Sequence, residues 1–85
     1  MLRIEAIETA RGHWILKAEG EVVGPWVAEL RRVCERVVGV DINVTLDLAE
    51  VAFLDREGVA LFRRLADQGV AFLNCSPFVQ NQLST

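Results

Sequence analysis

The order of strand and helix signals along the chain limits the possible folds more than any other feature. Residues 14–22 alternate as a strand, residues 26–38 carry apolar side chains at helical spacing, and residues 43–48 alternate again. A helix of about fourteen residues between two strands forms a βαβ unit, whose strands run parallel with a right-handed crossover in nearly all known cases. The sequence therefore predicts a parallel strand pair with a helix on one face.

The flanking segments complete the predicted order. Residues 2–6 alternate as a first strand, and Arg11, Gly12 and His13 predict a hairpin turn into the second strand, where Gly20 is expected to mark a bulge. A bend is predicted over residues 49–54, then a second helix from Asp55 to about Gln68 and an apolar strand over residues 70–74. Ser76 and Pro77 suit the cap and the first turn of a last short helix over residues 78–83. We expect an α/β fold in the order β-β-α-β-α-β-α, with a mixed sheet and helices packed mainly on one face.

Composition limits the class of partner. The chain has 85 residues, 52% of them hydrophobic, which fits one globular domain spanning residues 1–85. A net charge of −3, with arginines scattered among acidic residues, argues against nucleic acid as a partner. The sequence contains no apolar run long enough to span a bilayer and no signal-peptide pattern at its start. We expect a cytoplasmic protein that does not insert into membranes.

Residues for catalysis or metal binding are sparse. His13 is the only histidine and falls in the predicted turn, while Cys34 and Cys75 lie in apolar patterns as buried thiols would. The glycines do not have the spacing of a phosphate-binding loop. Asp47 and Asp55 form a conceivable carboxylate pair, but a helix-capping role for Asp55 explains the pattern better. The sequence predicts no enzyme activity, no cofactor and no metal site.

One long segment resembles a known family. The stretch VTLDLAEVAFLDREGVALFRRLADQGV, residues 44–70, resembles the STAS domain family, whose best-studied members are bacterial anti-sigma factor antagonists. The stretches AEGEVVGPWVAEL and NCSPFVQNQL resemble the family's segments before its first and third helices. The resemblance implies a STAS fold and a non-catalytic role in signalling and transcription regulation, with an anti-sigma factor or a related regulatory protein as partner.

The resemblance breaks at the start of the second helix. Switch members of the family carry Asp-Ser-Ser-Gly or Asp-Ser-Thr-Gly there, and a kinase phosphorylates a hydroxyl in it; this chain has Asp55, Arg56, Glu57 and Gly58. These residues sum to a charge of −1, that of the unmodified loop, whereas a phosphate adds about −1.5 to −2. We therefore expect a docking surface of Asp55, Arg56, Glu57, Gly58 and, further along the helix, Arg63 that cannot be phosphorylated.

Other interpretations stay open. Asp55 and Glu57 also suit a plain helix cap, and the unusual Gly58 indicates a close approach of another backbone, from this fold or from a partner. A STAS subunit that regulates a membrane-transporter ATPase is one alternative function. A small-molecule or nucleotide binder, using the cleft where strands end and helices begin, is another. A homodimer is also possible if one sheet face lacks helices and carries Trp14.

Overall fold

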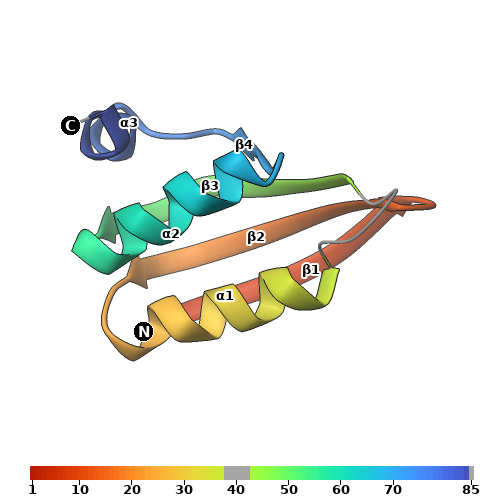
Figure 1. Ribbon diagram of the computed structural model, residues 1–85, viewed down its shortest axis with the longest axis horizontal. Coiled ribbons are helices and arrows are strands. Elements are labelled where there is room, and N and C mark those ends of the chain that lie inside the picture. Colours follow the sequence, from red (N-terminus) through yellow and green to blue (C-terminus); the bar gives the residue numbers. More distant parts are fainter. Residues whose placement is uncertain (38–42, 85) are drawn as a thin grey trace.

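The computed structural model describes residues 1–37 and 43–84, and its elements follow the predicted order. The elements are β1 (Leu2–Ala10), β2 (His13–Val22), α1 (Pro25–Val37), β3 (Asn43–Leu54), α2 (Arg56–Asp67), β4 (Ala71–Leu73) and α3 (Pro77–Ser84). The sheet has the order β1-β2-β3-β4, with β1 antiparallel to β2 and both other pairs parallel (Figure 1). The predicted fold class is confirmed. The predicted end of the first helix, at Val38 and Gly39, lies outside the described residues.

The core lies between the sheet and the pair α1 and α2, which cover the same face (Figure 1). Alternate strand residues supply one half of this core, among them Leu16, Leu46 and Leu48, and all three are fully buried. Leu30 from α1 and Phe62 from α2 are equally buried and supply the other half. The period-2 strands and the period-3.6 helices thus place their apolar stripes against one another, as their sequence patterns predict.

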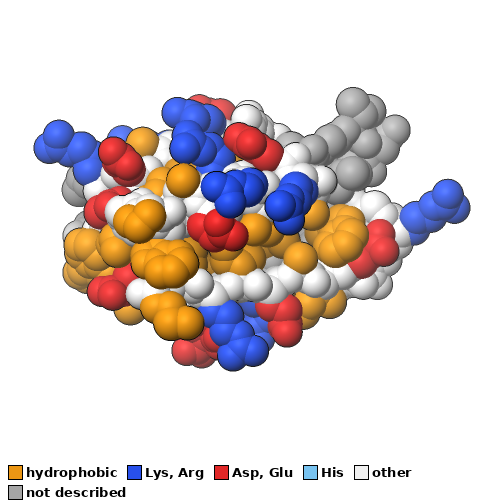
Figure 2. Space-filling model, turned by 90° about the horizontal axis from the view of Figure 1, so that it is seen from below, with side chains coloured by type: hydrophobic (Ala, Val, Ile, Leu, Met, Phe, Trp, Pro, Cys, Tyr) orange, Lys and Arg blue, Asp and Glu red, His pale blue; other side chains and the backbone are white. Residues whose placement is uncertain are grey.

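Hydrophobic side chains stay partly exposed where α1 meets the β1 side of the sheet. Ile4, Trp26, Val33 and Val37 pack against the core without being fully covered. The view from below has a band of hydrophobic side chains across its middle, with charged groups above and below it (Figure 2). The β1 side of the molecule is therefore its less well covered flank.

Trp14 does not lie on the open sheet face, where it would have supported a homodimer. Trp14 pairs with Val44 in the register, two residues before the pair Leu16 and Leu46. Side chains two residues apart share a face, so Trp14 lies on the helix-covered side with these buried leucines. The opposite face carries Arg3, Glu5, Lys17 and Glu19 instead. Homodimerisation stays a prediction, but Trp14 no longer supports it.

The bend predicted over residues 49–54 is also wrong, because β3 continues to Leu54. Its second half pairs with β2 from Glu19 to Val22, through two register shifts in which β3 supplies the extra residues. One shift adjoins Gly20, so an irregularity does occur there, although the extra residue is on β3. β1 likewise runs beyond residue 6, because pairing with β2 continues to the hairpin turn.

α3 covers the part of the β3 edge that β4 leaves open. β4 pairs only with Thr45, Leu46 and Asp47. Further along, the Gln82 amide donates to the Leu54 carbonyl at 2.7 Å and accepts from the Leu54 N–H at 3.2 Å. One side chain thus replaces a neighbouring strand at the last residue of β3. This contact fixes α3 next to the start of α2.

Candidate functional site

The predicted docking residues Asp55, Arg56, Glu57 and Gly58 form a strand-to-helix turn, here called the α2 corner. Asp55 has extended backbone angles, φ −85° and ψ −176°, and stands immediately before α2. Its Oδ1 accepts a hydrogen bond of 2.8 Å from the Gly58 N–H. This bond satisfies one of the amides that the first helical turn leaves unpaired. The prediction that Asp55 caps the second helix is confirmed.

Asp55 also joins two connections that lie far apart in sequence. Its Oδ2 accepts from the Gly24 N–H at 2.8 Å, and its own N–H donates to the Val22 carbonyl at 3.2 Å. Val22 ends β2 and Gly24 precedes α1, so the corner is tied to the neighbouring strand-to-helix connection. The hydrogen bonds from Gly24 and Gly58 lower the pKa of the Asp55 carboxyl below its ordinary value.

Gly58 is required by the fold itself. A Cβ on this residue would lie 2.6 Å from the Val22 carbonyl oxygen, a backbone atom that cannot move aside easily. The close approach that the sequence indicated is therefore internal to the molecule. Glycine destabilises a helix by up to about 1 kcal/mol relative to alanine. Its missing Cβ allows the end of β2 to pack directly against α2.

The predicted docking residues lie on two sides of α2. Asp55, Arg56 and Arg63 border an open hollow of about 620 Å³ between α2 and α3, here called the α2–α3 hollow, which Phe53, Val59 and Gln82 also line. Glu57 borders a different hollow, of about 370 Å³, toward α1. Both Arg56 and Glu57 are exposed. The structure thus brings three of the five predicted residues around one hollow and separates Glu57 from them.

Arg63 has a structural contact as well as an exposed position. Its guanidinium donates to the Leu83 carbonyl, with Nη2 at 3.1 Å and Nε at 3.4 Å. Cationic groups stabilise the C-terminal end of a helix, where carbonyls lack partners. Arg63 therefore holds the end of α3 against α2 while it borders the α2–α3 hollow.

Sequence reasoning missed two residues that shape the site. The Gly24 N–H holds Asp55, yet nothing in the sequence around Gly24 indicates a contact with the second helix. Gln82 fixes α3 beside the corner, and a polar residue in a short helix gives no local sign of such a contact. Both contacts join residues 28 or more positions apart, beyond the reach of local patterns.

The conceivable carboxylate pair does not act as one unit. Asp47 accepts hydrogen bonds from the Ala49 N–H and the Asn74 amide, while Asp55 binds Gly24 and Gly58. Over residues 1–37 and 43–84, no three His, Cys, Asp or Glu side chains gather as metal ligands, and no helix is long and apolar enough to cross a membrane. Cys34 and Cys75 are free thiols; burial, with Glu35 nearby, raises the pKa of Cys34 to about 11.

Solved structures of other proteins share the fold of this chain. No family model matches the sequence, and no curated protein matches it. The solved structure of the anti-sigma factor antagonist SpoIIAA in its unphosphorylated form is similar, with a TM-score of 0.69 and 17% identity over 96% of this chain and 82% of that one. A STAS-domain antisigma-factor antagonist from Rhodobacter sphaeroides is similar with a TM-score of 0.61 and 12% identity, over 86% of both chains. The chain therefore has the fold of the STAS-domain anti-sigma factor antagonists.

Proposed function

We propose that this protein is a non-catalytic interaction module that docks onto an anti-sigma factor or a related regulatory protein through the α2 corner and Arg63. Both similar structures are described as anti-sigma factor antagonists, one of them in its unphosphorylated form. In this proposal the protein is a constitutive binder, because Arg56 and Glu57 replace the hydroxyl residues at which switch members of the family are phosphorylated.

The rigidity of the α2 corner is the observation that carries the proposal. Both carboxylate oxygens of Asp55 accept backbone N–H groups, and Gly58 packs on the Val22 carbonyl. Asp55 is thus committed to structure, while Arg56 and Glu57 are exposed next to it. A surface fixed before binding loses less conformational entropy when a partner docks. The corner suits recognition better than proton transfer.

The chemistry of the α2–α3 hollow favours a protein partner. Arg56 and Arg63 provide two cations at its border, and Phe53 and Val59 provide apolar surface. Phe78 of α3 stacks near Phe53, with 6.2 Å between ring centroids, and these rings are 56% and 39% exposed. Exposed aromatic and arginine side chains are enriched at protein interfaces. We expect the partner to present an apolar side chain and a carboxylate here.

Binding to candidate partners tests the proposal directly. The purified protein would be titrated, by calorimetry, with each anti-sigma factor kinase of its source organism. Arg56→Glu is expected to weaken the complex by at least about tenfold, because a cation beside the partner's carboxylate becomes a repelling charge. Lys17→Glu makes the same charge change on the open sheet face and is the matched control. Equal losses for both variants, or no complex with any kinase, would contradict the proposal.

A phosphorylation assay tests the constitutive state separately. The native protein, incubated with a kinase that it binds and with ATP, is expected to gain no phosphate at the α2 corner. The double variant Arg56→Ser with Glu57→Ser restores two hydroxyl groups and is expected to gain phosphate there. Mass spectrometry of the corner peptide reads out both samples. Phosphate on that peptide of the native protein would rule out a constitutive binder.

A further inference from the structure

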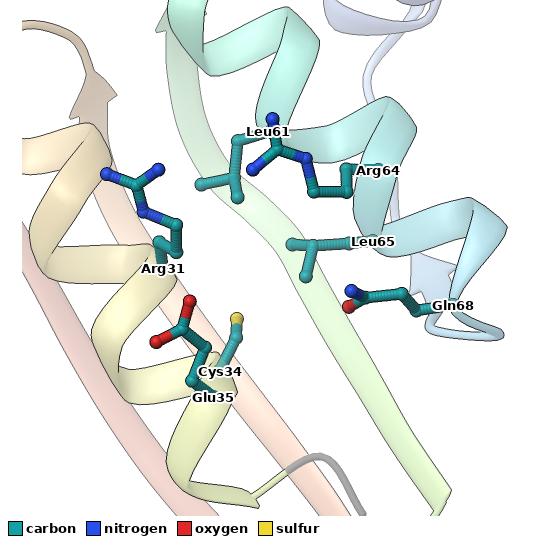
Figure 3. Close-up of a pocket in the computed structure, with 7 residues that line it drawn as sticks. All are labelled: Arg31, Cys34, Glu35, Leu61, Arg64, Leu65 and Gln68. Carbon is teal, nitrogen blue, oxygen red and sulfur yellow. The ribbon is translucent and has the colours of Figure 1, made fainter.

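A third hollow, here called the α1–α2 hollow, lies between the two helices that cover the sheet. It has a volume of about 190 Å³. Cys34 from α1 and Leu61 and Leu65 from α2 line it with apolar atoms, and all three are at least 96% buried. Figure 3 shows the Cys34 thiol and the Leu65 side chain pointing into the space between the helices. The apolar residues that line this hollow therefore belong to the hydrophobic core.

Two arginines border the same hollow from opposite helices. Arg31 extends from α1 and Arg64 from α2. The Arg64 side chain reaches past Leu61 toward α1, and the Arg31 guanidinium lies along the edge of α1 (Figure 3). Among residues 1–37 and 43–84, neither side chain forms an ion pair or a hydrogen bond. Arg3 and Arg32, by contrast, each pair with a glutamate. The lining of the hollow holds these two arginines and one glutamate, Glu35, so it carries a net positive charge in an acidic chain.

The two arginines also connect this hollow with the α2 corner. The hollow of about 370 Å³ that Glu57 borders is lined by Arg31, Leu61 and Arg64 as well. The two hollows therefore adjoin each other along the groove between α1 and α2. Glu57 near one end and Glu35 near the other place a carboxylate on each side of the arginine pair. A compact anion fits between them better than a polyanion.

We propose that the α1–α2 hollow binds a small amphiphilic anion, a carboxylate or phosphate monoester with a short apolar body, through Arg31 and Arg64 at its head and through Leu61, Leu65 and Cys34 at its tail. Guanidinium groups bind carboxylates and phosphates with strong, charge-assisted hydrogen bonds. Ligand sites combine mostly apolar walls with a few polar groups. The volume of about 190 Å³ lies below the roughly 300 Å³ at which sites for drug-sized ligands begin, so the apolar body is short.

Titration with a matched set of simple ligands tests the site. Hexanoate and hexyl phosphate represent the two head groups, hexanol lacks the charge, and inorganic phosphate lacks the apolar body. Amide chemical shifts of the full chain would be followed by NMR during each titration. Hexanoate or hexyl phosphate is expected to shift signals of Cys34, Leu61 and Leu65 at millimolar concentration, while hexanol and inorganic phosphate bind more weakly. The stronger of the two charged ligands identifies the head group.

Substitutions of the two exposed arginines distinguish specific binding in this hollow from nonspecific binding. Arg31→Gln and Arg64→Gln are each expected to weaken binding by about tenfold, because each removes a charge-assisted hydrogen bond. Arg32→Gln makes the same change on α1 at a residue that does not line the hollow, and it should bind like the native protein. If hexanol binds as well as hexanoate, or if the three variants behave alike, the proposal is wrong.

The Cys34 thiol offers an independent readout. Cys34 is almost fully buried, so its alkylation requires the groove between α1 and α2 to open. A saturating charged ligand that holds the two helices together is expected to slow this alkylation several-fold at alkaline pH. Cys75 does not line the hollow and serves as the internal control in the same sample. Unchanged alkylation of Cys34 in the presence of ligand that shifts the NMR signals would place the binding elsewhere and overturn the proposal.

Discussion

Two strand-to-helix turns in this molecule each have a side chain that caps the following helix. They differ in the contacts that this capping side chain makes with distant parts of the chain. The α2 corner is capped by Asp55; the turn before α3, here called the α3 corner, is capped by Ser76, whose Oγ accepts from the Val79 N–H at 3.2 Å. Asp55 additionally holds the Gly24 N–H, 31 residues away, whereas the Ser76 cap bonds within its own turn. A capping residue fixes one helix end, but only the α2 corner also joins two helices and two strands.

The long-range contacts of the α2 corner make it the better of the two turns for presenting a fixed surface. Asp55 bonds to three backbone groups, the Val22 carbonyl and the N–H groups of Gly24 and Gly58. Two of these groups come from distant parts of the chain, and they hold the exposed residues of the α2 corner in place. The α3 corner depends on one neutral hydrogen bond and on the packing of Val79, which is fully buried. A surface that must present a constant shape is better built on the first kind of turn. Substitutions in both corners and one pH titration test how far the two corners differ.

The largest effect is expected at Gly58. The substitution Gly58→Val places a branched side chain against the Val22 carbonyl oxygen, where even a single Cβ would lie 2.6 Å away. Overpacking of this kind costs about 3 kcal/mol. Urea denaturation at neutral pH would measure the free energy of unfolding. Ala60→Val, on the exposed side of the same helix, is the control for β-branching and should cost less than about 1 kcal/mol. Similar losses for both variants would show that the close approach carries little energy.

Removal of the Asp55 carboxylate is expected to have the next largest effect. Asp55→Ala leaves the Gly24 and Gly58 amides without their acceptor, and the loss of a charged cap with two bonds costs about 2 kcal/mol. Asp55→Asn keeps one acceptor oxygen and should lose about half as much. Thermal and urea unfolding of the two variants would rank them. If Asn costs as much as Ala, the negative charge and not the number of acceptors is what the corner requires.

The pKa of Asp55 adds a pH dependence that the α3 corner cannot have. The folded protein holds this pKa below the ordinary value of 3.8, so the unfolded state binds a proton more readily. The stabilising contribution is complete at pH values well above 3.8 and is lost as the pH falls through the lower pKa of the folded state. Unfolding midpoints measured between neutral pH and strong acid should therefore fall more steeply for the native protein than for Asp55→Asn. Parallel curves would contradict this assignment.

A smaller loss is expected when the α3 cap is removed. Ser76→Ala deletes one neutral hydrogen bond, to the Val79 N–H, and should cost about 1 kcal/mol. The effect should remain local, because Gln82 and Arg63 hold α3 independently through the Leu54 backbone and the Leu83 carbonyl. Amide hydrogen exchange would report faster opening in the first turn of α3 and unchanged protection in α2. Increased exchange in α2 would mean that the two corners unfold as one unit.

Local sequence patterns predict the capping residue of each corner. They do not predict which distant backbone groups the capping residue contacts. Asp55 and Ser76 were predicted as caps because side-chain oxygens before a helix satisfy nearby amides, and Gly58 indicated a close backbone approach. The partner atoms, Val22 and Gly24, came only from the structure. The predicted bend over residues 49–54 failed for the same reason, since those residues are held extended by the second half of β2. The strand pattern alone does not say which side the helices cover, so it leaves open a position of Trp14 on the uncovered face, which the register excludes.

The smallest effect on stability is expected where the functional effect should be largest. Arg56 and Glu57 are exposed, and neither side chain is among the hydrogen-bonding groups that build the α2 corner. Arg56→Ser with Glu57→Ser should therefore change the free energy of unfolding by less than about 0.5 kcal/mol. The same double variant is expected to become a phosphate acceptor. A loss of 2 kcal/mol or more, comparable with Asp55→Ala, would mean that the two side chains build the corner, and a role in partner recognition would then no longer be needed to explain them.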